Sequence, residues 1–116
     1  MNKNNVAIAE AYYTAMAEKN ITEMGKYLHS NVQLTGPLGS IEGKEAVLEA
    51  AKKLISSLKT LTIRAKCDSE DQAMIAFDLD FDEPIGKLRS VALLTIRDGL
   101  IVNNELFFDA RPFQQK

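Results

Sequence analysis

The chain has 116 residues with a formal net charge of −2, and 46% of its residues are hydrophobic. This length and composition predict one globular domain, spanning residues 1–116. The sequence has no basic stripe of the kind that nucleic-acid-binding proteins carry. Its single cysteine, Cys67, excludes an internal disulfide. No apolar run approaches the roughly 18 residues of a membrane helix, and the N-terminus does not resemble a signal peptide. We therefore expect a soluble cytoplasmic protein without nucleic-acid or membrane partners.

Three helices are predicted, over residues 4–18, 20–28 and 43–58. In the first helix, the helical spacing allows either Tyr12 or Tyr13 to face inward together with Met16. The second helix has an N-cap residue in Asn20 and a capping-box residue in Glu23. The third helix has the clearest apolar stripe, which comprises Val47, Ala51, Leu54 and Leu58.

Five strands are predicted, over residues 31–36, 61–67, 72–81, 88–97 and 100–108. The dipeptide Asp98-Gly99 between the last two strands is a strong hairpin signal. In the second strand, strict alternation places Leu61, Ile63, Ala65 and Cys67 on one face. Helices followed by a mostly antiparallel sheet predict an α+β domain. The hollow between a curved sheet and its helices is a common place for a small ligand.

The last strand, LIVNNELFF, has two possible registers. In the first, Asn104 points into the hollow with the apolar residues Val102, Leu106 and Phe108. In the second, the inward set is Ile101, Asn103, Glu105 and Phe107. The first register is favoured, and it gives a buried amide that needs a ligand, a water molecule or Tyr12 as its partner. The second register gives an inward carboxylate, Glu105, that could act as a base.

Three aspartates, Asp78, Asp80 and Asp82, follow the spacing that opens a calcium loop. That loop also requires glycine at its sixth position and glutamate at its twelfth, where this chain has Glu83 and Arg89. The aspartates are expected to face outward, where Arg89 and Arg97 can partner them. One histidine, His29, and one cysteine do not make a zinc set. We expect neither a metal nor a cofactor.

Three segments carry a resemblance to a known family: AYYTAMAEKNITEMGKYLHSNVQLTGPLG, IEGKEAV and RDGLIVNNELFFDARPF. The chain resembles the nuclear transport factor 2-like superfamily, and within it the SnoaL-like and ketosteroid-isomerase-like branch. The resemblance implies a cone-shaped fold, in which three N-terminal helices pack on a strongly bent mixed, mostly antiparallel sheet with a pocket at the wide end. The superfamily includes isomerases, cyclases, hydrolases, dehydratases and proteins that only bind, so the fold implies no single function.

The resemblance also assigns positions in the ketosteroid isomerase pattern. Tyr12 falls where that family keeps its oxyanion-hole tyrosine. The general-base aspartate falls on Gly36, and the second, protonated aspartate falls near Ala92. In that isomerase one carboxylate moves the proton, while a tyrosine and a neutral carboxylic acid stabilise the enolate. Glycine and alanine can do neither, so we expect the isomerase mechanism to be absent. A glycine before Pro37 would instead enlarge the cavity mouth or tighten the turn.

Other candidate residues have both a structural and a functional interpretation. Tyr12 is either a hydrogen-bond donor into the pocket or a core tyrosine whose hydroxyl reaches a rim. Asp109 is either a turn residue that accepts backbone N–H bonds or, by the resemblance, the acid/base of a SnoaL-like cyclase. Residues 110–116 either close the pocket or extend away from it.

The expected function is the binding of a small apolar or carbonyl-containing molecule, without a cofactor. The expected ligand-binding residues are Tyr12, Met16, Leu34, Gly36, Leu54, Leu61, Ile63, Phe77, Leu79, Phe81, Leu94, Asn104, Leu106 and Phe108. One alternative is an isomerase, cyclase or hydrolase that uses Asp109 or Glu105. Another is a non-catalytic homodimeric scaffold, because Val91, Leu93, Thr95 and Phe107 make the outer sheet face apolar.

Overall fold

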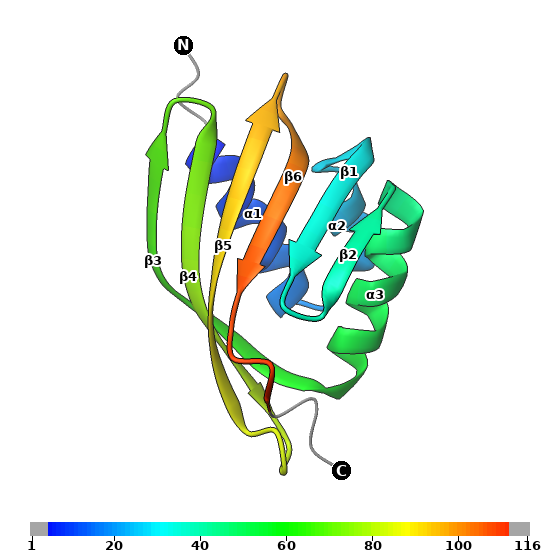
Figure 1. Cartoon of the computed structure of the whole chain (residues 1–116), viewed down its shortest axis with the longest axis vertical. Coiled ribbons are helices and arrows are strands. Elements are labelled where there is room, and N and C mark those ends of the chain that lie inside the picture. The colour runs from blue at the N-terminus through cyan, green and yellow to red at the C-terminus, as the bar shows by residue number, and fades with distance from the viewer. Residues whose placement is uncertain (1–4, 112–116) are drawn as a thin grey trace.

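The computed structural model describes residues 5–111 and contains every predicted helix and strand (Figure 1). Residue 4 and residues 112–116, for which a helical start and a pocket-closing role were considered, lie outside the described residues. The helices are α1 (Asn5–Ala17), α2 (Ile21–Gly25) and α3 (Lys44–Ser57). The strands are β1 (Leu28–Gly36), β2 (Gly39–Glu42), β3 (Leu58–Ser69), β4 (Gln72–Phe81), β5 (Lys87–Arg97) and β6 (Leu100–Phe107).

The strands form one sheet in the order β2-β1-β6-β5-β4-β3. Strands β1 and β6 pair in parallel, and the other neighbours pair antiparallel. This confirms the predicted α+β architecture with a mixed, mostly antiparallel sheet. Figure 1 looks onto the outer face of the curved sheet, with α1 behind the strands and α3 beside β2. We call the face that α1 covers the inner face.

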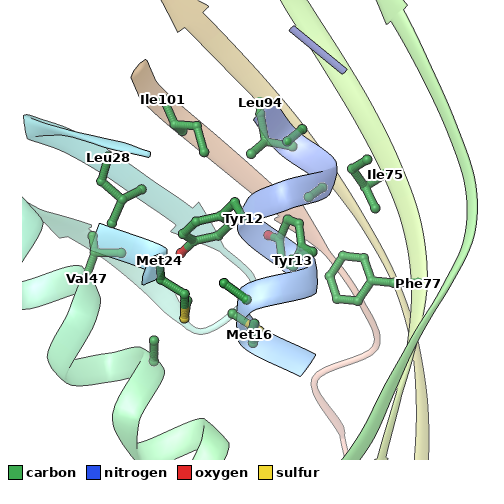
Figure 2. Close-up of a cluster of buried hydrophobic side chains, with 14 of the residues drawn as sticks. Tyr12, Tyr13, Met16, Met24, Leu28, Val47, Ile75, Phe77, Leu94 and Ile101 are labelled. Atoms are coloured by element: carbon green, nitrogen blue, oxygen red, sulfur yellow. The ribbon is translucent and has the colours of Figure 1, made fainter. Parts of the chain in front are cut away.

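Helix α1 supplies the centre of the core. Its residues Tyr12, Tyr13 and Met16 are all buried against the inner face of the sheet (Figure 2). Ala9 and Ala15 are buried on the same helix. Because both tyrosines are buried, the choice between Tyr12 and Tyr13 that the spacing left open does not arise.

Helix α2 is short and is fixed at its start by a cap. The Asn20 side-chain oxygen accepts a hydrogen bond from the Glu23 backbone N–H at 3.0 Å, as predicted. The Glu23 carboxylate does not complete a capping box; it accepts a hydrogen bond from the Tyr27 hydroxyl and pairs with Lys26. The cap positions Met24, which is fully buried in the core.

Strand β2 was not predicted from the sequence. Its residues follow a tight turn, in which Gly36 and Gly39 are Cα partners across the β1–β2 hairpin. The strand has only four residues, GSIE, with a single large apolar side chain, Ile41. A short edge strand of this kind carries too little alternation to be recognised.

A β-bulge reverses the faces of β3, so the predicted alternation over residues 61–67 is wrong in its second half. The register shifts between Ile63 and Ala65, and beyond this point Ala65 and Cys67 are exposed. Lys66 now faces α1, where its Nζ lies 2.7 Å from Glu10 Oε1. An inserted residue moves every later side chain to the other face, which periodicity alone does not reveal.

A bulge in β6 makes the strand follow one predicted register before residue 102 and the other after it. Ile96 pairs with Ile101, whereas the preceding Thr95 pairs with Asn103, which leaves Val102 as the extra residue. Ile101 and Asn104 are therefore both buried, although their positions differ in parity. The first register holds from Asn104 onward, so Glu105 lies on the outer face.

Candidate functional site

A cavity of about 310 Å³ lies between the inner face of the sheet, α1, α3 and the β1–β2 hairpin. This volume is at the lower end of the range for small-molecule pockets. The lining residues are Tyr12, Tyr13, Met16, Leu34, Gly36, Leu38, Gly39, Ser40, Ile41, Val47, Ala50, Ala51, Leu54, Phe77, Leu79, Leu88, Ser90, Asn104, Leu106 and Phe108. The exposed residues of this set are Leu38, Gly39 and Ser40 of the β1–β2 hairpin, which therefore forms part of the rim.

Most of the residues expected from the sequence lie on this wall. They are Tyr12, Met16, Leu34, Gly36, Leu54, Phe77, Leu79, Asn104, Leu106 and Phe108. Four expected residues, Leu61, Ile63, Phe81 and Leu94, do not line the cavity and pack in or against the hydrophobic core instead. Alternation along a strand identifies the inner face, but it does not tell which part of that face is covered by other elements.

Several residues that line the cavity were not predicted from the sequence. Val47 and Ala51 were predicted as the apolar stripe of α3, and this stripe turns out to form a wall of the cavity. Gly39, Ser40 and Ile41 were missed with strand β2. The remaining additions are Tyr13, Leu38, Ala50, Leu88 and Ser90. Ser90 had a detectable signal, because it is the polar residue in the inward-facing set of β5.

The polar centre of the cavity wall is a hydrogen bond between Asn104 and Tyr13. Asn104 Nδ2 donates to the Tyr13 hydroxyl at 2.9 Å, and the two side chains are only 3% and 2% exposed. Asn104 thus points inward as the favoured register requires, but it contacts Tyr13 instead of Tyr12. The second amide atom, Asn104 Oδ1, is buried and has no hydrogen-bond partner among the described residues.

The two tyrosines differ in how they are held. The Tyr13 ring stacks on Phe77 with centroids 4.5 Å apart, and Tyr12 meets Tyr13 edge-to-face at 5.0 Å. The Tyr12 hydroxyl has no hydrogen bond within residues 5–111, and Figure 2 shows it directed towards the side of Met24 and Val47. Burial raises the pKa of both tyrosines above its ordinary value. Both therefore stay protonated and can act as neutral donors.

Leu106 occupies the space beside the two positions that the resemblance assigns to carboxylates. A Cβ atom at Gly36 would lie 3.3 Å from Leu106 Cβ, so any side chain there would press against this leucine. Ala92 is fully buried and is the Cα partner of Leu106 across β5 and β6. The glycine therefore allows close packing against β6, which is a more specific role than the enlarged mouth or tight turn expected from the sequence.

The two carboxylates considered as acid/base candidates lie outside this cavity lining. Glu105 is on the outer face, where its Cα partners are Leu93 and Thr35. Asp109 forms an ion pair with Arg111 at 2.6 Å and accepts its backbone N–H at 3.0 Å. The hydrogen bonds from Arg111 lower the pKa of Asp109 to about 2. This geometry matches the structural interpretation of Asp109 as a turn residue.

The remaining polar candidates have local partners. Thr60 Oγ1 donates to Asp80, while Arg64 and Lys59 lie 3.7 Å from Asp78 and Asp82. These partners come from β3, whereas Arg89 and Arg97 of β5 had been expected. His29 Nδ1 accepts the Asn31 backbone N–H. Within residues 5–111, no group of histidine, cysteine, aspartate and glutamate side chains could hold a metal ion.

The fold is that of the nuclear transport factor 2-like proteins, and the chain belongs to the SnoaL-like domain family, which it matches over residues 9–104. It is similar to a nuclear transport factor 2-like protein of unknown function from Cytophaga hutchinsonii (18% identity, TM-score 0.86, covering 99% of this chain and 98% of that one). It is also similar to TerC, co-crystallised with polyporic acid (19%, 0.81, 97% and 96%). A third similar structure is a steroid delta-isomerase from Pseudomonas aeruginosa (15%, 0.80, 98% and 86%).

A search of the curated proteins gave no significant match. Across the part of the chain that the structure describes, no helix has the length and hydropathy to cross a membrane.

The different partners of the two tyrosines lead to a stability prediction. Tyr13→Phe removes the partner of the buried Asn104 amide, so we expect it to lower the free energy of unfolding by about 1–3 kcal/mol. Tyr12→Phe removes a hydroxyl without a protein partner, and we expect little or no loss. Urea denaturation of the two matched variants measures the difference. Equal losses would show that the Tyr13–Asn104 bond does not carry the stability assigned to it.

Proposed function

We propose that the cavity binds a small, uncharged, mostly apolar molecule and that the chain does so without the carboxylate chemistry of a ketosteroid isomerase. The observation that carries this proposal is the lining itself. Its side chains are apolar except for two tyrosines, two serines and Asn104, and none of these is charged at neutral pH. A few neutral polar groups among apolar walls are typical of small-molecule sites.

The neutrality of the wall limits the ligand. A buried charge without a paired countercharge is costly, so a carboxylate or ammonium group would not enter this lining readily. The similar structures support a small-molecule site in general terms, since one is a steroid delta-isomerase and another was crystallised with polyporic acid. A carbonyl group would suit the Tyr12 hydroxyl as an acceptor.

The positions of the carboxylates favour binding without proton transfer. A general base must come within hydrogen-bond reach of the proton that it removes. Gly36 and Ala92 have no titratable group, Glu105 belongs to the outer face, and Asp109 is engaged by Arg111. An isomerase, cyclase or hydrolase that uses Glu105 or Asp109 would need one of these carboxylates to leave its present surroundings.

Filling the cavity with a larger side chain tests the binding proposal. Ala50 lines the cavity from α3, whereas Ala46 is exposed on the same helix and does not. In a panel of apolar carbonyl compounds, we expect at least one to raise the melting temperature of the wild-type protein. Ala50→Phe should abolish that shift, and Ala46→Phe should retain it. The proposal fails if no compound shifts the wild type or if both variants respond alike.

The raised pKa values of the two tyrosines in the cavity wall predict that the binding affinity does not change with pH near neutrality. The tyrosines of the wall have pKa values raised by burial, so the affinity should stay constant from roughly pH 5 to pH 9. Stability should fall above about pH 10, because the tyrosines of the unfolded chain ionise before those of the folded chain. Calorimetric titrations across this range measure the profile. A loss of affinity near neutral pH would reveal a titrating group in the site and favour catalysis.

A second candidate function, a homodimeric binding module, is supported by the outer sheet face. Phe107 is 53% exposed and Met74 is 40% exposed on this face, beside the partly buried Val91 and Leu93. Exposed aromatic and aliphatic side chains grouped on one face often mark a partner surface. By the family resemblance, the partner would be a second copy of the chain, with the two outer faces in contact.

A charge on the outer face tests this dimer. We expect Phe107→Asp to convert a dimer into a monomer, because two copies would bury unpaired carboxylates at the interface. Leu38→Asp is the matched control, since Leu38 is 58% exposed at the hairpin turn and lines the cavity on the inner side of the sheet. Light scattering after size exclusion gives the molar mass. A monomeric wild type, or a Phe107→Asp protein that stays dimeric, would contradict the homodimer.

A further inference from the structure

The hydrogen bond between Asn104 and Tyr13 leaves two bonding capacities unused on the cavity wall. Asn104 Oδ1 is a buried acceptor without a donor. The Tyr13 oxygen accepts from Asn104 Nδ2, and its own proton has no acceptor among the described residues. One acceptor and one donor therefore lie next to each other, on residues that both line the cavity.

Both groups are held in place by the fold, so the pair is preorganised. The Tyr13 ring is stacked on Phe77, and Asn104 lies in the sheet between Leu34 of β1 and Leu94 of β5. A buried acceptor that stays unpaired costs free energy. A ligand group that satisfies the pair would remove this cost.

The pair favours a compact ligand group that both donates and accepts a hydrogen bond. A hydroxyl both donates and accepts, whereas a ketone or an ether only accepts and an ammonium group only donates. We propose that the ligand of this cavity carries a neutral hydroxyl group, which donates to Asn104 Oδ1 and accepts from the Tyr13 hydroxyl. This inference rests on the proposed small-molecule function and adds the chemical class of the ligand, an apolar alcohol or phenol.

Two alternatives to this proposal are a water molecule bound to the pair and a ligand hydroxyl bound at Ser90. A water molecule has the same donor and acceptor capacity as a hydroxyl, so ordered water is the competing occupant of the pair. Ser90 offers a second polar site, because its Oγ is also buried without a hydrogen-bond partner. Ser90 pairs with Phe77 on β4, whereas Asn104 pairs with Leu94 farther along β5. Ser90→Ala is therefore a matched control on the same wall.

Three probes with one carbon skeleton test the proposal: a tert-butyl-substituted cyclohexanol, the matching methyl ether and the matching ketone. Their dissociation constants are measured by NMR titration. We expect the wild-type protein to bind the alcohol about tenfold more tightly than the ether, as one or two hydrogen bonds would give. Asn104→Leu should bring the alcohol-to-ether ratio close to one while ether binding persists, and Ser90→Ala should leave the ratio unchanged.

Two further measurements keep the test decisive if Asn104→Leu is unstable. The double variant Tyr13→Phe with Asn104→Leu replaces both polar partners by apolar groups of similar shape, which proteins tolerate better than the loss of one partner. It should also lose the preference for the alcohol. In the wild-type protein, the side-chain amide resonances of Asn104 should shift with the alcohol and much less with the ether.

The outcomes separate this inference from the proposed function. If the ether and ketone bind as tightly as the alcohol, or if the preference survives in the double variant, the hydroxyl assignment is overturned and the small-molecule function stands. If Ser90→Ala removes the preference instead, the assignment to Asn104 and Tyr13 is overturned. If none of the probes binds to the wild-type protein, both proposals fail together.

Discussion

The hydrogen bond from Asn104 to Tyr13 joins the first helix to the last strand, across 91 residues of sequence. It links α1 to the sheet through two side chains that line the cavity. The stacking of Tyr13 on Phe77 extends this contact to β4. The Asn104 amide nitrogen forms this bond, whereas the amide oxygen has no partner among the described residues. The side chain that links the helix to the sheet therefore also provides a polar group on the cavity wall.

The packing of Leu106 supports our proposal that this cavity lacks the carboxylate chemistry of a ketosteroid isomerase. Gly36 and Ala92 stand where the resemblance assigns carboxylates, and Leu106 is packed beside both. An apolar side chain thus lies where charged groups would need space and solvation. The hydrogen-bonded polar side chains of the wall are Tyr13 and Asn104, which are neutral. They support the proposed recognition through hydrogen bonds without proton transfer. A shared fold with a different set of polar side chains is common among small α+β domains.

Two bulges give the sheet its distinct surfaces. In β3 the bulge turns Lys66 towards Glu10 of α1, and in β6 the bulge brings Ile101 and Asn104 to the same face. Without the second bulge, either the core would lose an isoleucine or the cavity would lose its amide. The outer face keeps Glu105 and the exposed Phe107, and its apolar part is the surface for which we propose a second copy.

The sequence by itself determined the helices, five of the six strands, the family, and the inner face of β3 before the bulge at residue 64 and of β6 after its bulge. Helical and alternating periodicities report which side of an element is apolar, and that information is local. The tertiary structure alone decided that Asn104 contacts Tyr13 instead of Tyr12, that β2 forms, and that Leu94 lies in the core while Ser90 lines the cavity. These outcomes depend on which elements pack against each other and on single-residue insertions in the strands, and neither leaves a periodic trace in the sequence.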